Sequence, residues 1–353
     1  MALEIDEFLL ELLRSRSPTG TEHEAAQIIE KYAGPSADSI VRDHIGNRIA
    51  VYGSGERTLM FAAHSDEIGL IVSYIDDDGF LFFDTLGGHD NVMIPGRRVA
   101  VMSRNGNVYG VTGKRAVHLM DAKERKEVPE THQIWIDIGA GSRAEAEALV
   151  EIGDPVVYDV AVRKLAGGRC AARAFDDRAG CYAVFEVLRR LKSSNLKPDF
   201  RVAAVATSQE EIGTRGAYPA AYAMNPDVAV AVDVTHATDF PTCDKRKFGS
   251  IKLGKGPVIA RGPNINPKVF DKLVACAKAS GIPYQIEAES RPTGTDARVL
   301  QISRGGVAAG LVSIPLRYMH TPGEVVDLND IEMCVRLLKD FAVSLKSSDD
   351  FTY

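Results

Sequence analysis

The sequence lacks the features that mark secreted, membrane-spanning and nucleic-acid-binding proteins. Its five cysteines are scattered and form no C-x-x-C pair, which argues against a disulfide framework and a thiolate metal site. No apolar run reaches the roughly 18 residues of a membrane helix, so we expect no membrane span. The net charge of −6 provides no basic face for nucleic acid. Acidic residues interrupt the apolar N-terminal segment, so we expect no signal peptide and a cytoplasmic protein.

The residues that are present have the composition of a globular protein, with 45% apolar and 25% charged. A chain of 353 residues exceeds what one hydrophobic core usually fills, so we expect two domains. Residues 70–160 form short apolar runs separated by turn signals every 8–12 residues, as in a small β-barrel or sandwich. On both sides of this segment, predicted strands alternate with predicted helices.

This alternation predicts an α/β domain with a largely parallel sheet, into which a smaller β domain is inserted. We expect the α/β domain at 1–68 and 163–353 and the inserted domain at 69–162. The predicted strands of the α/β domain cover residues 47–52, 58–63, 200–207, 228–234 and 307–314. Its predicted helices cover residues 4–15, 22–33, 177–191, 267–280 and 329–346.

Potential metal ligands stand where these predicted strands end or where the next helix begins. Because α/β proteins place their sites at the carboxyl edge of a parallel sheet, we expect these side chains to converge. A sixth residue, Glu210, directly precedes one of them and belongs to the same turn. The candidate ligands are His64, Asp176, Glu211, Asp233 and His320.

Each motif alone has an ordinary structural explanation. His64 with Asp66 is equally a core histidine beside a turn, Asp176 is equally a helix cap, and His320 is equally a loop histidine. Glu210-Glu211 is a stronger signal because both acids follow an apolar strand directly. Neighbouring side chains of an extended chain point apart, so one acid can bind a metal while the other faces a substrate.

Taken together, two histidines and three acids without a thiolate suit a pair of Zn²⁺, Co²⁺ or Mn²⁺ ions. One carboxylate must bridge if two ions share five ligands. Paired ions about 3.5–4 Å apart hold the attacking and leaving oxygens of a hydrolysis. The residues therefore predict a two-metal hydrolase.

Six stretches along the chain carry a resemblance to one known family. They are AAHSDEIGLIV (62–72), AFDDRAGCY (174–182), SQEEIGTRGA (208–217), AVDVTHA (231–237), GTDA (294–297) and VSIPLRYMHTPGEVVDLND (312–330). The chain resembles the tetrahedral-type (TET-type) aminopeptidases, co-catalytic two-zinc exopeptidases that include glutamyl, leucyl and lysyl aminopeptidases. The resemblance implies a sheet sandwiched by helices, an inserted β-barrel dimerisation domain, and a hollow homododecamer built from dimers.

The resemblance also implies a role for each candidate residue. One ion takes His64 and Asp233, and the other takes Glu211 and His320. Asp176 is the bridging carboxylate, with Asp177 behind it where related enzymes have a cis peptide. The catalytic residues are Glu210 as the general base and Asp66 as the partner of His64. The inserted domain lies between His64 and Asp176, 112 residues apart, whereas related dimeric exopeptidases place theirs after the fourth ligand.

The resemblance further implies that the enzyme removes N-terminal residues from peptides. It places the substrate pocket around two stretches that depart from the family pattern. Arg291-Pro292 stands where a run of glycines is frequent, and Gly323 stands where a larger apolar residue is common. These departures bear on substrate preference rather than on the metal site. The residues assigned to the pocket are Thr293, Gly294, Asp296 and Arg317.

Three alternatives compete with a metalloaminopeptidase. A glycosidase of the endoglucanase type would need two carboxylates about 5–10 Å apart across a sugar cleft, and it would leave both histidines without a role. A deacylase or carboxypeptidase with the same metals is disfavoured by the position of the inserted domain. A non-catalytic scaffold would have no need of Glu210 beside a complete ligand set.

Overall fold

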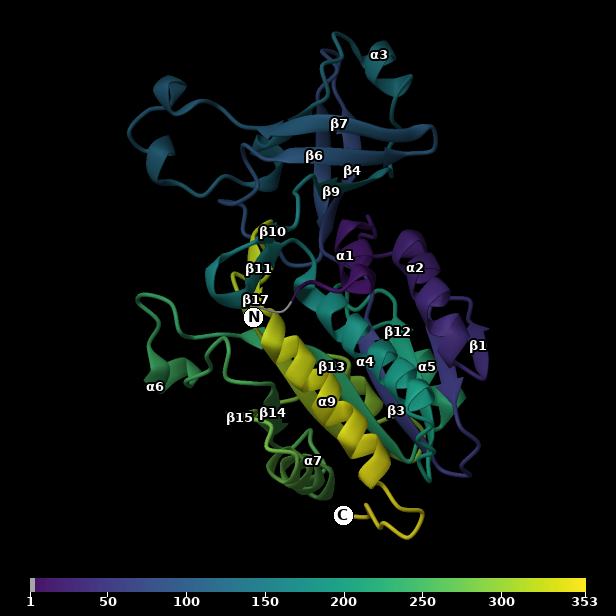
Figure 1. Ribbon diagram of the computed structural model, residues 1–353. Coiled ribbons are helices and arrows are strands. Elements are labelled where there is room, and N and C mark those ends of the chain that lie inside the picture. The colour runs from purple at the N-terminus through teal and green to yellow at the C-terminus, as the bar shows by residue number, and fades with distance from the viewer. Residues whose placement is uncertain (1–3) are drawn as a thin grey trace.

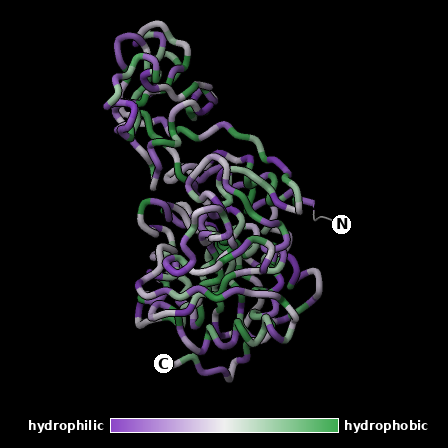
Figure 2. Tube along the Cα trace, turned by 90° about the vertical axis from the view of Figure 1, so that its left-hand side faces the viewer, coloured by the Kyte–Doolittle hydropathy of each residue, from purple (hydrophilic) through white to green (hydrophobic). Residues whose placement is uncertain are grey.

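The strands of residues 4–353 form one 11-stranded sheet and a separate closed barrel (Figure 1). The structure is a computed structural model that describes residues 4–353, so the first three residues of the expected α/β domain lie outside it. Figure 2, turned by 90°, shows the barrel projecting from one end of the larger sheet domain. Within residues 4–353, no helix has both the length and the apolar character needed to cross a membrane.

The centre of the sheet consists of four parallel strands, all almost completely buried. They are β12 (Arg201–Thr207), β3 (Thr58–His64), β13 (Val228–His236) and β16 (Ala308–Arg317). Near-continuous Val, Ala, Leu and Ile sequences are typical of strands covered on both faces. Thr207 pairs with His64 in the register of β12 and β3, so these strands end together. The predicted parallel sheet is confirmed.

Antiparallel strands extend this sheet at both edges. On one side lie β2 (Arg48–Tyr52) and β1 (Ser39–Arg42). On the other side lie β17 (Glu324–Asp327), β11 (Arg169–Ala172) and β10 (Arg163–Lys164). A branch from β16 adds β14 (Val258–Arg261) and β15 (Gln285–Ala288).

Helices cover the sheet in two layers. In the first layer, α4 (Phe175–Ser193) packs on β3 and β13 beside α9 (Leu328–Ser344), with α1 (Glu7–Arg14), α2 (His23–Ala33) and α7 (Pro267–Ala279) around them. In the second, α5 (Ala217–Met224) and α8 (Ala297–Leu300) pack together against β3, β12 and β13. A short helix, α6 (Lys245–Phe248), lies in the connection between β13 and β14.

The inserted segment is a six-stranded barrel with a hydrophobic core of its own, built from residues such as Leu70, Phe83 and Val101. Its strands are β4 (Gly69–Ile75), β5 (Leu81–Leu86), β6 (Arg98–Ser103), β7 (Gly106–Gly113), β8 (Trp135–Asp137) and β9 (Pro155–Tyr158), and α3 is Arg143–Glu147. The predicted inserted barrel is confirmed. The domain boundaries and the dimerisation role remain predictions.

Candidate active site

The structure brings all five predicted ligands together at the carboxyl edge of the central sheet. His64 is the last residue of β3, and Asp233 lies near the end of β13. The other ligands come from the start of α4, the turn after β12 and the turn between β16 and β17. Because β3 leads into β4 within five residues, this edge of the sheet faces the barrel (Figure 1).

Asp176 lies between the two histidines, with one oxygen toward each. Its Oδ1 is 2.9 Å from His64 Nε2, and its Oδ2 is 3.4 Å from His320 Nε2. Asp233 Oδ1 lies 3.9 Å from the same nitrogen of His64. Glu211 Oε2 lies 3.3 Å from the same nitrogen of His320. The five side chains therefore form two groups that share one carboxylate.

The neighbouring Asp177 is also close enough to join a ligand group with His64 and Asp233. The peptide bond between Asp176 and Asp177 is cis, as the resemblance implies. Both oxygens of Asp177 accept backbone N–H groups, from His64 at 3.2 Å and from Gly180 at 3.0 Å. Its carboxylate is thus engaged with the backbone that carries His64, which leaves Asp176 as the carboxylate between the histidines.

The electrostatics of the polypeptide alone call for cations. Burial, together with the charges of Asp233, Asp296 and Glu211, raises the pKa of Glu210 to about 10, although the charge of His64 acts in the opposite direction. Burial lowers the pKa of His320, but its contacts with Asp176 and Glu211 raise it to about 11. So many buried carboxylates cannot all ionise without compensating positive charge. Together with the all-nitrogen-and-oxygen donor set, this fits two divalent ions.

Asp66 contacts the ring of His64 and also supports the separate turn that carries Glu210. Its Oδ1 is 3.5 Å from His64 Nδ1, and its backbone oxygen is 3.2 Å from the same atom. Its carboxylate also accepts the backbone N–H groups of Glu210 and Glu211. A second carboxylate, Glu22, accepts the N–H of Gln209 at 3.1 Å. Sequence reasoning missed Glu22, because a glutamate just before a helix carries no signal of a contact 187 residues away.

The barrel contributes two glycines that pass directly over the ligands. A Cβ on Gly88 would lie 3.2 Å from His320 Nδ1, and one on Gly87 would lie 3.3 Å from the Glu211 side chain. The absence of a side chain therefore lets the chain after β5 approach the site. The sequence analysis does not single out this pair, because nothing local to it indicates contact with another domain.

The four residues predicted for the substrate pocket lie in different settings. Asp296 is 3% exposed, its Oδ2 accepts the Thr207 hydroxyl at 2.6 Å, and its Oδ1 has no partner within residues 4–353. Thr293 is buried and bonds Asn264, whereas the adjacent Gly294 is exposed. Arg317 donates to Asp239 at 2.7 Å, which directs its charge at that carboxylate.

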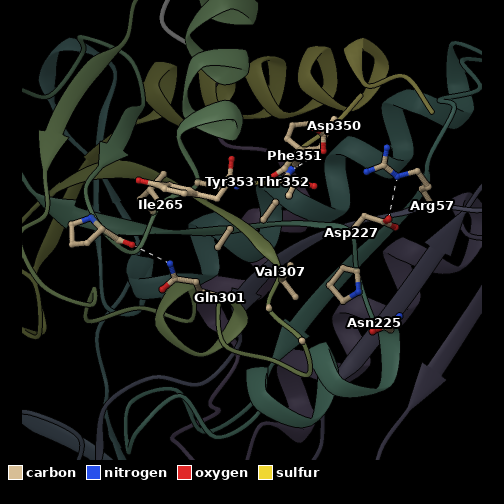
Figure 3. Close-up of a pocket in the computed structure, with 17 residues that line it drawn as sticks. Arg57, Asn225, Asp227, Ile265, Gln301, Val307, Asp350, Phe351, Thr352 and Tyr353 are labelled. Carbon is tan, nitrogen blue, oxygen red and sulfur yellow. Dashed lines mark hydrogen bonds and ion pairs between the residues drawn. The ribbon is translucent and has the colours of Figure 1, made fainter. Parts of the chain in front are cut away.

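A cavity of about 760 Å³ lies elsewhere (Figure 3). It is lined by Arg57, Asp227, Val307 and residues 350–353, where β3, β13 and β16 begin. Arg57 and Asp227 form an ion pair at one side of it, with 3.1 Å between Arg57 Nε and Asp227 Oδ1. Open α/β sheets bind ligands outside the carboxyl ends of their strands, so this cavity is at the wrong edge for the chemistry.

Comparisons with known proteins find relatives along nearly the whole chain. Residues 46–337 match the family described as M42 glutamyl aminopeptidase. The chain is 38% identical to the lysyl aminopeptidase of Pyrococcus furiosus over 346 residues, covering 97% of this chain and 98% of that protein. It superposes on a TET aminopeptidase from Thaumarchaeota archaeon SCGC AB-539-E09 with a TM-score of 0.93, 33% identity and coverage of 97% and 96%. It also superposes on the TET1 peptidase of Pyrococcus horikoshii, which can assemble into a tetrahedron or a large octahedral shell. The TM-score is 0.85, the identity is 32%, and the match covers 96% of this chain and 99% of that chain.

Proposed function

The chain belongs to the M42 glutamyl aminopeptidase family, and we propose that it is a two-metal aminopeptidase with Glu210 as its general base. Members of this family are metalloaminopeptidases, which are hydrolases acting on peptide bonds. The resemblance inferred from the six sequence stretches is therefore confirmed at the level of family and enzyme class. The presence of two metal ions, the roles of individual residues and the assembly belong to the proposal.

The position of Asp176 carries the proposal. A carboxylate that presents one oxygen to His64 and the other to His320 has the arrangement of a ligand shared by two ions. We assign His64 and Asp233 to one ion and Glu211 and His320 to the other. Two divalent ions held there would supply Lewis-acid activation of water and of the scissile carbonyl. Zn²⁺ and Co²⁺ are the first candidates and Mn²⁺ is the third.

Glu210 performs the proton transfers in this proposal. It takes a proton from the attacking water and returns it to the leaving amine. Asp66 holds the backbone N–H of Glu210, which fixes where that carboxylate points. The acids of the site, including the buried Asp296, whose Oδ1 has no partner in the described part of the chain, attract the free α-ammonium group and so restrict cleavage to the first residue. Thr293, Gly294 and Arg317 complete the proposed pocket. Of these, Arg317 has the smallest role in binding the substrate, because its guanidinium already donates to Asp239.

Replacement of the general base tests this assignment. Glu210→Gln keeps the size of the side chain but removes its basicity, so we expect kcat on aminoacyl-p-nitroanilides to fall by roughly 10²–10⁴-fold with the metal content unchanged. Glu186→Gln is the matched control, because Glu186 is a buried glutamate of α4 paired with Arg189 and Arg190. Wild-type turnover in the Glu210 variant would refute the role.

The relatives support a proposal for the assembly. We propose a cytoplasmic homododecamer built from dimers that associate through the barrel, because the TET1 peptidase of Pyrococcus horikoshii can assemble into a tetrahedron or a large octahedral shell. A subunit of 38.3 kDa then predicts a particle about twelve times heavier. Light scattering coupled to size-exclusion chromatography measures that mass directly, and a monomeric peak would contradict the proposal.

A further inference from the structure

Glu324 joins two parts of the proposed metal centre without belonging to the ligand set. It is the first residue of β17 and only 2% exposed. Its Oε2 accepts the backbone N–H of Asp176, and its Oε1 accepts the backbone N–H of His320, each at 3.2 Å. One carboxylate therefore ties the backbone of the shared ligand to that of a terminal ligand.

The sheet topology explains how this contact arises. Glu324 pairs with Ala172 in the antiparallel ladder of β17 and β11. Since α4 begins at Phe175, shortly after β11 ends, this pairing sets the Glu324 side chain beside the first turn of α4. The same residue also ends the turn that carries His320. Two segments 148 residues apart thus meet at one side chain.

The turn that carries His320 needs such a support. His320 has φ of 58° and Tyr318 has φ of 63°, a left-handed conformation that non-glycine residues adopt at a cost. Such conformations persist where the surroundings over-determine them. The Glu324 hydrogen bond to the N–H of His320 is one of the contacts that hold this turn.

We propose that Glu324 is a positioning residue of the metal centre, which sets the spacing and orientation of Asp176 and His320 and thereby the affinity for a divalent cation. The inference rests on the proposed two-metal function. Backbone groups beneath metal ligands determine where the ligand atoms point, and loss of such outer contacts typically lowers metal affinity or activity by about 10–100-fold.

A purely structural role is the alternative, and Asp330 offers the matched control. Asp330 is also a fully buried carboxylate that accepts two backbone N–H groups, from Gly254 at 2.6 Å and Gly256 at 2.7 Å. It lies in the first turn of α9, and neither glycine is part of the candidate metal site. Asp330→Asn therefore removes the same kind of contact without touching the ligands.

The experiment compares Glu324→Gln with Asp330→Asn in the full-length protein. Glutamine keeps one acceptor oxygen but presents an amide group to the second backbone N–H. We expect chelator competition with Zn²⁺ to show that Glu324→Gln weakens binding of one ion by about 10–100-fold, with activity returning in excess metal. Asp330→Asn should keep wild-type metal affinity whatever it does to the melting temperature.

Wild-type affinity in Glu324→Gln, or an equal loss in Asp330→Asn, would overturn the inference. If the wild-type protein itself bound no divalent ion, the proposed function would fail instead, so the two failures are distinguishable. Should Glu324→Gln not fold, Glu324→Asp keeps the charge but withdraws it by one methylene. The Co²⁺ absorption spectrum of that variant should then differ from that of the wild type, and an identical spectrum would refute the inference.

Discussion

The side chain of Asp66 accepts the backbone N–H of Glu210, with 3.0 Å between Oδ1 and the nitrogen. The other oxygen accepts the N–H of Glu211 at 3.1 Å. Asp66 is fully buried, and it also lies against the ring of His64. One carboxylate thus connects a proposed ligand of one ion, a proposed ligand of the other and the proposed base.

Replacing Asp66 should therefore disturb catalysis as well as metal binding. Asn keeps one acceptor oxygen, so in Asp66→Asn one of the two backbone N–H groups loses its partner. We expect kcat/KM to fall by roughly 10–100-fold and to recover only in part in excess metal, because the Glu210 turn is displaced too. Steady-state kinetics across a Zn²⁺ titration measure both effects. If kcat/KM recovered fully at high Zn²⁺ concentration, Asp66 would act only by orienting His64 and not by positioning the Glu210 turn.

A methyl group added at Gly88, in the segment after β5, should lower the activity by displacing His320. In Gly88→Ala the new Cβ would lie 3.2 Å from His320 Nδ1, so the ring must move by a few tenths of an ångström. Small displacements of catalytic groups are costly, and we expect kcat/KM to fall by roughly tenfold. Gly305→Ala is the control, because its Cβ would enter open space. Equal activity in the two variants would show that the barrel does not constrain His320.

Removal of the metal ions should abolish activity and lower thermal stability together. Ions that bind only the folded state stabilise it by about 2.7 kcal/mol at a concentration 100 times the dissociation constant. We expect dialysis against EDTA to eliminate hydrolysis of aminoacyl-p-nitroanilides, with recovery on addition of Zn²⁺ or Co²⁺. A glycosidase of the two-carboxylate type would instead keep its activity on glycosides after dialysis against EDTA. Undiminished peptidase activity at a metal content of zero, measured by elemental analysis, would contradict the two-metal proposal.

The pH dependence of stability should contain a contribution from Asp330. Burial raises the pKa of Asp330 from an ordinary 3.8 to about 6, although Gly254 and Gly256 donate to its carboxylate. Between these values the folded state holds a proton that the unfolded state has lost, so stability falls as pH rises through this window. The difference corresponds to about 3 kcal/mol. In Asp330→Asn this decline should vanish, which denaturation at pH 4, 5, 6 and 7 measures. Parallel curves for the two proteins would contradict the shifted pKa.

Sequence patterns predicted most of the architecture because they are local. The buried strands β3, β12, β13 and β16 appear as apolar runs, and α4, α7 and α9 appear as amphipathic periods close to their observed bounds. The short strands β11, β14, β15 and β17 were not predicted, since each has four residues and no clear alternation. Their pairing depends on which edge of the sheet they reach, and that is a property of the whole fold.

The candidate site, too, could be predicted only in part from the sequence. The identities of the ligands could be predicted because chemistry restricts metal binding to a few residue types, and strand ends are visible in the chain. Glu22, Gly88 and Glu324 could not, because each acts on a residue far away in sequence: Glu324 contacts Asp176 across 148 positions. No local pattern encodes such a contact.

The amino-acid sequence alone is enough to identify the residues available for the chemistry, the succession along the chain of the strands that present them and the insertion of a β domain between His64 and Asp176. These properties depend on side-chain chemistry and on the short periods of strands and helices. The tertiary fold alone places one oxygen of Asp176 toward each histidine, the Asp66 carboxylate on the Glu210 turn, and Gly87 and Gly88 against Glu211 and His320. Those relationships depend on packing between segments that the chain separates by a hundred residues or more, and only the folded sheet brings them to one edge.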